Sequence, residues 1–339
     1  MQFTTPIHDF GQTFQLTGSD KILALGSCFA QVMGQRLADN RLDIVFNPTG
    51  VLYNPESIFL TIDTLLDIAQ GNSDMLQQLK SLTFEGQDGR WYNWMAASVI
   101  QEDSREKCDS ALTEALHLTA KHLSTLTVLM LTFGTDHYYT LKDNIQQPIA
   151  NCHKMPAAMF EERILTTEEI VRRFDNTCRR LMELRPELKI IVSVSPYRYL
   201  KYGLHTSQLS KARLLLATDE IQRRHNAVHY FPAYEIMNDE LRDYRFYAAD
   251  MVHPSETAEE YIWQTFCDHY MSDRMKQFMR EWAPLLKQKA HRTKNPAAQQ
   301  ALDDRLHRQH IGKPLQLPPE RPRDIVRHDA GREVVQGLL

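Results

Sequence analysis

Nearly continuous apolar runs alternate along this chain with longer stretches of helical periodicity, and this alternation restricts the fold more than any other feature. Runs such as ILAL, VLMLTF and IIVSV have almost no polar face, as expected of strands that are covered on both sides in a parallel sheet. The candidate strands are residues 21–25, 42–46, 127–133, 188–194 and 227–231.

Amphipathic stretches of helical length lie between these strands. They span residues 30–40, 55–70, 105–123, 166–184 and 207–224, and a last helix is expected from 254 towards 282. Thr166 and Glu169 have the spacing of a capping box at the start of the fourth helix. The alternation predicts an α/β fold, a three-layer α/β/α sandwich around a mostly parallel five-stranded sheet.

Two segments interrupt the alternation. Residues 81–101 have the pattern of a β-hairpin with Asp88-Gly89 as its turn. Residues 134–165 contain no clear helix and include Pro148 and Pro156, so we expect an irregular functional loop there.

Charge is unevenly distributed along the 339 residues. The chain has 39 basic and 43 acidic residues, a formal net charge of −4, which argues against a nucleic-acid-binding protein. Beyond residue 285 there are 11 basic and 6 acidic residues and several prolines. We therefore predict one domain over residues 1–285 and a basic extension over residues 286–339, helical at its start and then extended and solvated.

No apolar run approaches the roughly 20 residues that span a bilayer, and the N-terminus lacks the pattern of a secretory signal. These features predict a cytoplasmic protein without a membrane partner, and they leave the oligomeric state open. The five cysteines are scattered and form no C-x-x-C pair, which argues against a disulfide framework and a structural zinc site.

Metal and nucleotide motifs are weak in this sequence. His225 and His229 have the i, i+4 spacing of helical metal ligands, but the preceding helix is expected to end near Arg224. There is no H-E-x-x-H pattern and no glycine-rich phosphate loop. We therefore expect neither a metal nor another cofactor.

Ser27 lies at a strand-to-helix turn, directly after the first expected strand. Such a serine lies at the carboxyl edge of the sheet, where open α/β proteins bind ligands, and a helix N-terminus there favours a developing anion. Gly26 permits the tight turn. A serine at this place is also the usual N-cap of a helix, so the position alone favours capping over catalysis. We expect Cys28 to be a small packed thiol.

Asp250 and His253 follow the last expected strand and precede the last helix. Their spacing allows the carboxylate to accept the imidazole Nδ1–H, which leaves Nε2 to take a proton from a serine. With Ser27 they have the chain order Ser, Asp, His.

Several ordered motifs resemble the GSCFA family, a branch related to the SGNH (GDSL-like) hydrolases. They are residues 26–30 (GSCFA), 47–55 (NPTGVLYNP), 131–135 (LTFGT), 151–154 (NCHK) and 250–255 (DMVHPS). The resemblance covers residues 1–285 and does not extend to the basic segment.

The resemblance implies a catalytic site of the SGNH type. Ser27 is then the nucleophile, His253 the general base and acid, and Asp250 the carboxylate that orients the imidazole. The N–H groups of Ser27 and Gly50 form the oxyanion hole, where each donor contributes about 3 kcal/mol of transition-state stabilisation.

The chain departs from the SGNH pattern at the third oxyanion donor. The family's asparagine is replaced in the stretch 134–137 (GTDH), and an ionised Asp136 would repel an oxyanion. Thr135, Asn54 and Asn151 are the alternative donors that the resemblance leaves open.

Four residues in the family motifs, Tyr53, Asn54, Asn151 and His153, are expected to bind substrate. For His153 a second interpretation is equally open, in which the ring anchors its own loop through hydrogen bonds to the backbone.

The hairpin also departs from the family pattern, and its aromatic residues have two possible interpretations. Met95 and Ala96 stand where the family has polar residues, which implies a changed substrate preference or reduced activity. A platform for a sugar ring is offered by the aromatic side chains Tyr53, Trp91, Tyr92 and Trp94. Hairpin core is the favoured interpretation of these aromatics.

Together these features predict a serine hydrolase that removes a small acyl group, acetyl in the simplest case, from an O-ester of a carbohydrate. The substrate class, a small-molecule or oligosaccharide ester, rests on the resemblance alone. An acyltransferase with the same triad and a non-catalytic binding protein on the same fold are the alternatives.

Overall fold

The five expected apolar strands form one parallel sheet in the computed structural model, which describes residues 4–7, 14–72 and 74–290. The strands are β1 (Lys21–Gly26), β2 (Asp43–Phe46), β6 (Val128–Phe133), β10 (Lys189–Val194) and β11 (Val228–Tyr230). Their order is β11-β10-β6-β1-β2, and all neighbouring pairs are parallel. The chain changes direction across the sheet between β1 and β6, so a topological switch point lies at the carboxyl ends of these two strands.

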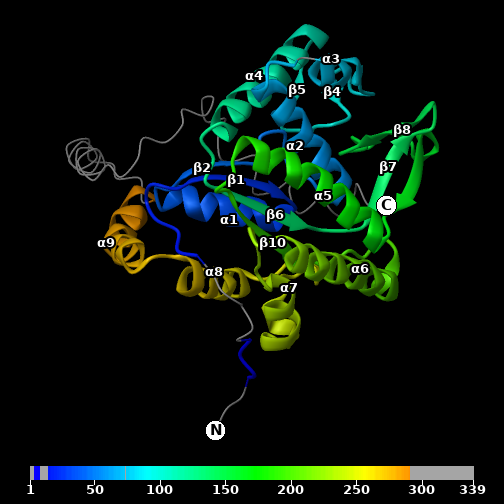
Figure 1. The fold of residues 1–339 in the computed structure, drawn as a ribbon. Coiled ribbons are helices and arrows are strands. Elements are labelled where there is room, and N and C mark those ends of the chain that lie inside the picture. Colours follow the sequence, from blue (N-terminus) through cyan, green and yellow to red (C-terminus); the bar gives the residue numbers. More distant parts are fainter. Residues whose placement is uncertain (1–3, 8–13, 73, 291–339) are drawn as a thin grey trace.

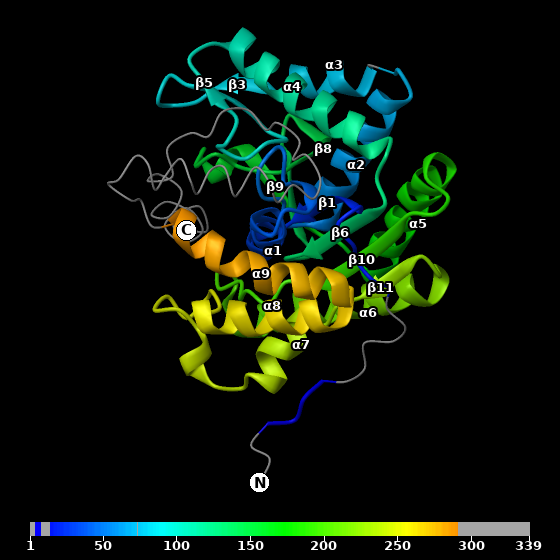
Figure 2. The ribbon, with the colours of Figure 1, turned by 90° about the vertical axis from the view of Figure 1, so that its left-hand side faces the viewer.

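Helices cover both faces of this sheet (Figures 1 and 2). One face packs against α2 (Pro55–Ala69), α4 (Arg105–Leu123), α5 (Thr167–Leu184) and α6 (Gly203–Arg224), and the other against α1 (Cys28–Asp39) and α8 (Glu256–Tyr270). Alternate residues of β1 enter the two cores, Leu23 and Leu25 the first and Ile22 and Ala24 the second. The predicted three-layer α/β/α sandwich is therefore confirmed.

The capping box predicted for the fourth helix is confirmed at the start of α5. The Thr166 hydroxyl accepts the N–H of Glu169 at 3.2 Å, and the Glu169 carboxylate accepts the N–H of Thr166 at 2.8 Å. Two of the N–H groups that a helix leaves without intrahelical partners are thus satisfied by local sequence alone.

The prediction of a single helix over residues 254–282 is wrong, because two helices occupy this range. α8 ends and α9 (Asp273–Ala290) begins around Met271, which adopts an extended conformation. Leu16 forms a bridge with Met271, and its N–H donates to the carbonyl of Tyr270 at 2.6 Å. A segment distant in sequence therefore occupies backbone groups that a continuous helix would have used.

The prediction of an irregular loop over residues 134–165 is also wrong. This segment forms a three-stranded antiparallel sheet in the order β8-β7-β9. Its elements are β7 (His137–Leu141), β8 (Asn144–Ile149), the 3-10 turn η1 (Ala157–Met159) and β9 (Phe160–Ile164). The sequence of β9, FEERI, is only half buried and has no apolar run. Pro148 is tolerated because β8 is an edge strand.

The hairpin predicted over residues 81–101 is confirmed with its turn at Asp88-Gly89. Gly89 has φ +75°, and the N–H of Gly86 donates to the carbonyl of Arg90 at 2.7 Å. The antiparallel strands are β3 (Thr83–Glu85), β4 (Trp91–Asn93) and a third, unexpected strand, β5 (Gln101–Glu102). The remaining short elements are α3 (Asp74–Ser81), α7 (Ala233–Glu235), the π-helical turn η2 (Ile236–Glu240) and the 3-10 turn η3 (Tyr244–Phe246).

The predicted boundary at residue 285 lies inside α9, which continues to Ala290. The helical start of the basic segment is thereby confirmed. Its further residues, 291–339, lie outside the described part of the chain.

Gly26 ends β1 at the point where this strand lies directly against β6. Its φ is +146°, and a Cβ at this position would lie 2.3 Å from the carbonyl oxygen of Thr132. The Gly26 N–H donates to Asn47 Oδ1 at 2.9 Å, and the Gly26 carbonyl accepts the N–H of Leu52 at 2.9 Å. Three backbone segments thus meet at one residue that has no side chain.

We expect Gly26→Ala to lower the free energy of unfolding by about 3 kcal/mol or more, because the backbone conformation costs about 1–3 kcal/mol in a non-glycine residue and the clash with β6 adds a similar cost. Gly71→Ala is the matched control, since Gly71 also has positive φ (+80°) but faces open space. It should lose only about 1–2 kcal/mol. Urea denaturation of both variants measures the difference, and equal losses would contradict the importance of the contact with Thr132.

Candidate active site

Ser27 is the residue between β1 and α1, and it caps the helix. Its Oγ accepts the N–H of Phe29 at 3.3 Å, and its own N–H donates to the carbonyl of Thr132 at 3.3 Å. The side chain is buried, with only 2% of the residue exposed. The capping interpretation is therefore confirmed. Capping uses Oγ as an acceptor only, so the hydroxyl hydrogen can still be donated to a base.

Asp250 and His253 form a hydrogen-bonded pair in the loop before α8. The imidazole Nδ1 lies 2.5 Å from Asp250 Oδ2, and Asp250 Oδ1 accepts the N–H groups of Val252 (2.9 Å) and His253 (3.0 Å). Burial opposes ionisation of Asp250, but these hydrogen bonds outweigh it and lower the pKa of the carboxyl group. An ionised carboxylate accepts only, so Nδ1 carries the proton and Nε2 is left as a base.

Arg198 fixes the loop that carries this pair. Its N–H donates to the carbonyl of Val252 at 3.1 Å, and its guanidinium donates to the carbonyl of Met251 at 3.4 Å. The guanidinium also lies 3.9 Å from the centre of the Tyr247 ring, a favourable cation–π geometry. Met251 has φ +58°, so these contacts support a residue in a costly conformation.

Tyr197 and Glu259 lie between the two halves of the site. The Tyr197 ring packs edge-on against His253 with 4.8 Å between ring centres, and its hydroxyl donates to Glu259 Oε1 at 2.9 Å. Burial raises the pKa of Glu259, while the hydrogen bond from Tyr197 and, to a smaller extent, Arg36 and His253 oppose this rise. Burial, and to a smaller extent Glu259, also raises the pKa of the Cys28 thiol beside Ser27.

The predicted hydrogen bond between Ser27 and His253 is not made among the described residues. Within the described part of the chain, the hydrogen bond of Ser27 Oγ is to Phe29, that of the His253 ring is to Asp250, and none joins Ser27 to His253. The Asp250–His253 pair has the predicted hydrogen bond. Its connection to Ser27 stays a prediction.

The N–H groups predicted to form the oxyanion hole already have acceptors. That of Gly50 donates to the carbonyl of Asn47 at 2.8 Å, that of Thr135 to the carbonyl of Tyr53 at 2.9 Å, and that of Ser27 to Thr132. The Thr135 hydroxyl lies 3.3 Å from Ser210 Oγ. The predicted oxyanion hole is therefore not open in this conformation, and its donors stay a prediction.

Asp136 is fully buried and has a partner of opposite charge. Its Oδ2 lies 2.6 Å from the guanidinium of Arg213 on α6, and its N–H donates to Ser210 Oγ at 3.1 Å. Oδ1 lies 3.6 Å from His137 Nε2, and the other ring nitrogen of His137 lies 2.7 Å from Glu162. The negative charge that would disfavour an oxyanion is thus compensated within the protein.

Three of the four expected substrate-binding residues make structural hydrogen bonds. Asn54 caps α2 by accepting the N–H of Ser57 at 2.8 Å, and Asn151 Oδ1 accepts the N–H of His153 at 2.8 Å. His153 Nε2 lies 3.0 Å from the carbonyl of Asn93, which favours the anchoring interpretation of this ring. Substrate binding by these residues stays a prediction.

Tyr53 differs from those three, because its hydroxyl lies 3.6 Å from Cys28 Sγ and so beside Ser27. The hairpin aromatics are core: Tyr92 and Trp94 are buried, and Trp94 stacks on Phe84 with 3.6 Å between ring centres. Met95 and Ala96 are buried as well.

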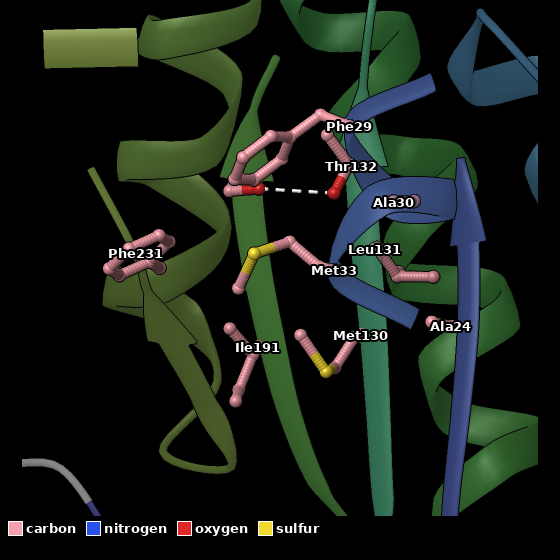
Figure 3. Close-up of a pocket in the computed structure, with 10 residues that line it drawn as sticks. Ala24, Phe29, Ala30, Met33, Met130, Leu131, Thr132, Ile191 and Phe231 are labelled. Atoms are coloured by element: carbon pink, nitrogen blue, oxygen red, sulfur yellow. Dashed lines mark hydrogen bonds between the residues drawn. The ribbon is translucent and has the colours of Figure 1, made fainter. Parts of the chain in front are cut away.

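Two pockets border the candidate site, the first at Phe29 and the second at Glu259. The first is a small cavity of about 10 Å³ between α1 and the sheet (Figure 3). Phe29, Met33 and Met130 line it, together with Thr132 and Ser193, whose hydroxyl groups are hydrogen-bonded to each other. It has room for about one water molecule. The second is an open groove of about 870 Å³ along the start of α8. Its charged lining residues are Arg36, Glu240, Glu256, Glu259 and Glu260.

The histidines considered as metal ligands have other partners. α6 ends at Arg224, as expected, and His225 Nε2 lies 2.7 Å from Asp175. Across residues 4–7, 14–72 and 74–290, no group of three or more side chains has an arrangement that could coordinate a metal ion. In the same residues, no helix is both long enough and apolar enough to cross a membrane.

Four residues around the candidate site were not anticipated: Tyr197, Arg198, Glu259 and Lys211, whose side chain donates to the carbonyl of Gly134 at 2.7 Å. Tyr197 and Arg198 lie in the loop that follows β10 at the carboxyl edge of the sheet, so their position was a usable signal. Lys211 falls on the apolar face of α6, between Ser207 and Leu214, where a lysine is unusual. Nothing in the sequence distinguishes Glu259 from the other acidic residues at the start of α8.

Comparison with known proteins identifies one family. The GSCFA family matches residues 21–266 of the chain. The same comparison found no curated protein and no solved structure that matches the chain.

The half-buried His153 predicts a pH dependence of stability. Burial lowers its pKa to about 4, whereas a histidine in the unfolded chain titrates near 6.5. Between these values the unfolded state binds more protons than the native state, so stability falls as the pH drops from about 6.5 to about 4, by at most about 1.4 kcal/mol per pH unit. His153→Gln should remove this contribution.

The measurement is urea denaturation at a series of pH values between 4 and 7, with the exposed His205 replaced by Gln as control. Wild type and His205→Gln should lose stability more steeply than His153→Gln. The same slope in all three proteins would contradict a lowered pKa of His153 in the native state.

Proposed function

The chain belongs to the GSCFA family, and from this premise we propose that it is a serine hydrolase of the SGNH type. Its reaction is the removal of a small acyl group, acetyl in the simplest case, from an O-ester of a carbohydrate. Ser27, His253 and Asp250 act as nucleophile, general base and orienting carboxylate.

The observation that carries this proposal is the Asp250–His253 pair. One carboxylate oxygen accepts the imidazole Nδ1–H at 2.5 Å, while the other accepts two backbone N–H groups from the same loop. The carboxylate is thereby fixed, and it fixes the tautomer in which Nε2 is the basic nitrogen. This is the support that a general base needs to act on a serine hydroxyl.

The position of Ser27 supports its assignment as nucleophile. It lies at the switch point between β1 and β6 and at the N-terminus of α1, where the helix dipole favours negative charge. Because Oγ accepts the N–H of Phe29, its hydroxyl hydrogen is free to be donated to His253 Nε2.

In the first step, Ser27 Oγ loses its proton to His253 Nε2 and attacks the ester carbonyl. The tetrahedral intermediate collapses when the imidazolium protonates the leaving alcohol, and an acyl-serine remains. In the second step, His253 takes a proton from water, the hydroxide attacks the acyl-serine, and the acid leaves as Ser27 regains its proton. Asp250 stabilises the imidazolium in both steps.

The oxyanion requires at least one N–H group that changes partner. The N–H of Ser27 is the best placed, since its bond to the carbonyl of Thr132 is long, at 3.3 Å, compared with 2.8 Å for Gly50 and 2.9 Å for Thr135. We expect the Ser27 N–H to turn to the oxyanion, with the N-terminus of α1 adding its dipole.

A carbohydrate as the alcohol part of the ester agrees with the groove along α8. Glu259 lines this groove and accepts the hydroxyl of Tyr197, which in turn packs against His253. Carboxylates are strong acceptors for hydroxyl groups, and the groove has space for a sugar beside Glu259.

A second candidate function is a non-catalytic binding protein. It is favoured by one observation, the engagement of the N–H groups of Ser27, Gly50 and Thr135 with backbone carbonyls. In this case the site around Ser27 would bind a ligand without stabilising an oxyanion.

Hydrolysis of p-nitrophenyl acetate and of an acetylated oligosaccharide between pH 5 and 9 tests the proposal. We expect activity to rise with pH, as general-base catalysis requires, and to fall by about 10⁶-fold in Ser27→Ala because no nucleophile remains. Asp250→Asn should also lose most of the activity, because it no longer fixes the tautomer.

Ser104→Ala is the matched control, because Ser104 caps α4 as Ser27 caps α1. Both alanine variants should lose about 1 kcal/mol of stability from the missing cap, but only Ser27→Ala should lose activity. Inactive wild-type protein that also resists labelling by a fluorophosphonate would reject the hydrolase and support the binding protein.

A further inference from the structure

Lys211 is a lysine in the interior of the protein that has no place in the mechanism above. It lies on α6 with only 2% of the residue exposed. Its ammonium group donates to the carbonyl of Gly134 at 2.7 Å and to the carbonyl of Ser195 at 2.9 Å. These two residues directly follow β6 and β10, which are neighbouring strands, so one side chain connects two strand ends at the carboxyl edge of the sheet.

The surroundings of Lys211 offer little to stabilise its charge. Among the described residues no carboxylate bonds to it; Asp136 acts on it from a distance and is itself paired with Arg213 at 2.6 Å. The Tyr234 ring lies 5.7 Å from the ammonium group. Burial lowers the pKa of Lys211 to about 7, against the opposing effect of Asp136. A buried lysine is costly, and an apolar side chain would fill the same space at lower cost.

Both protonation states of Lys211 can serve the two carbonyls. The ammonium has three N–H bonds and the neutral amine has two. The connection between the strand ends therefore does not depend on which form is present.

The peptide that Lys211 contacts forms the wall beside Ser27. The N–H groups of Gly134 and Thr135 donate to the carbonyl of Tyr53 at 2.8 and 2.9 Å. A Cβ on Gly134 would lie 3.4 Å from Ser27 Cβ and 2.8 Å from the Tyr53 carbonyl oxygen. Tyr53 thus fixes this peptide through its N–H groups, and Lys211 fixes it through its carbonyl. Glycine itself restricts the backbone very little.

We propose that Lys211 is a positioning residue, which fixes the Gly134–Thr135 peptide against Ser27 and so determines the space next to the nucleophile. In its absence the Gly134 carbonyl would lose its donor and the peptide could rotate. The catalytic consequence of this proposal rests on the proposed hydrolase function, while the positioning itself is a property of the folded chain.

The test compares Lys211→Met, which keeps the length and apolar volume of the side chain without its donors, with Thr218→Val on the same helix. Thr218 is equally buried, and its hydroxyl bonds to a carbonyl within α6. Two measurements are made on both variants: amide hydrogen exchange by NMR, and steady-state hydrolysis of p-nitrophenyl acetate.

In Lys211→Met we expect exchange at Gly134 and Thr135 to become at least about tenfold faster than in wild type, because the peptide loses one of its two supports. We expect kcat to fall by about 10- to 100-fold with KM within about twofold, since misplacement near the reacting atoms affects the transition state more than binding. Thr218→Val should change neither measurement. If Lys211→Met does not fold, Lys211→Gln replaces it, since its amide keeps two N–H bonds on a shorter side chain and should give a smaller change in the same direction.

Unchanged exchange at Gly134 and Thr135 would overturn the proposal, whatever the activity. Faster exchange with unchanged kcat in an active enzyme would overturn it as well. Wild-type protein that neither hydrolyses the ester nor reacts with a fluorophosphonate overturns the proposed hydrolase function instead. In that case exchange alone decides whether Lys211 positions the peptide, and faster exchange supports it.

Discussion

The close approach of β1 to β6 at Gly26 is the contact on which the site depends. No side chain fits between the Gly26 Cα and the carbonyl of Thr132, so the two strand ends lie in direct backbone contact. This approach sets the start of α1 and leaves Ser27 between the two strand ends and the helix N-terminus. Any chain with this strand order would have a switch point at this place in the sheet. Gly26 lets the two strands come close enough for Ser27 to lie at that switch point.

Two of the loops around this point are held in part by charged side chains that donate to backbone carbonyls. Lys211 donates to the carbonyls that end β6 and β10, and Arg198 donates to the carbonyl of Met251 in the histidine loop. Buried or partly buried cations are costly, but their hydrogen bonds are directional and strong. Burying these side chains lowers the stability of the fold, while their hydrogen bonds fix the peptides beside Ser27 and His253.

Sequence periodicity predicted the central sheet well because its strands are buried on both faces, which removes polar residues from them. The same reasoning failed for the antiparallel sheet that contains β9, because a half-exposed strand such as FEERI resembles a loop. It also failed at Met271, where the helix is interrupted by pairing with Leu16. In both cases the decisive contacts are non-local, and a window of sequence cannot contain them.

The sequence by itself determined the alternation of strands and helices, the family, and the pairing of Asp250 with His253, because each depends on residues close together in the chain or on an ordered set of motifs. Only the tertiary structure decided that the charge of Asp136 is compensated by Arg213, 77 residues away. It alone decided which N–H groups beside Ser27 already have acceptors, and that Lys211 supports the Gly134 peptide. Such partnerships depend on which strand ends the fold brings together, and local propensities carry no information about that.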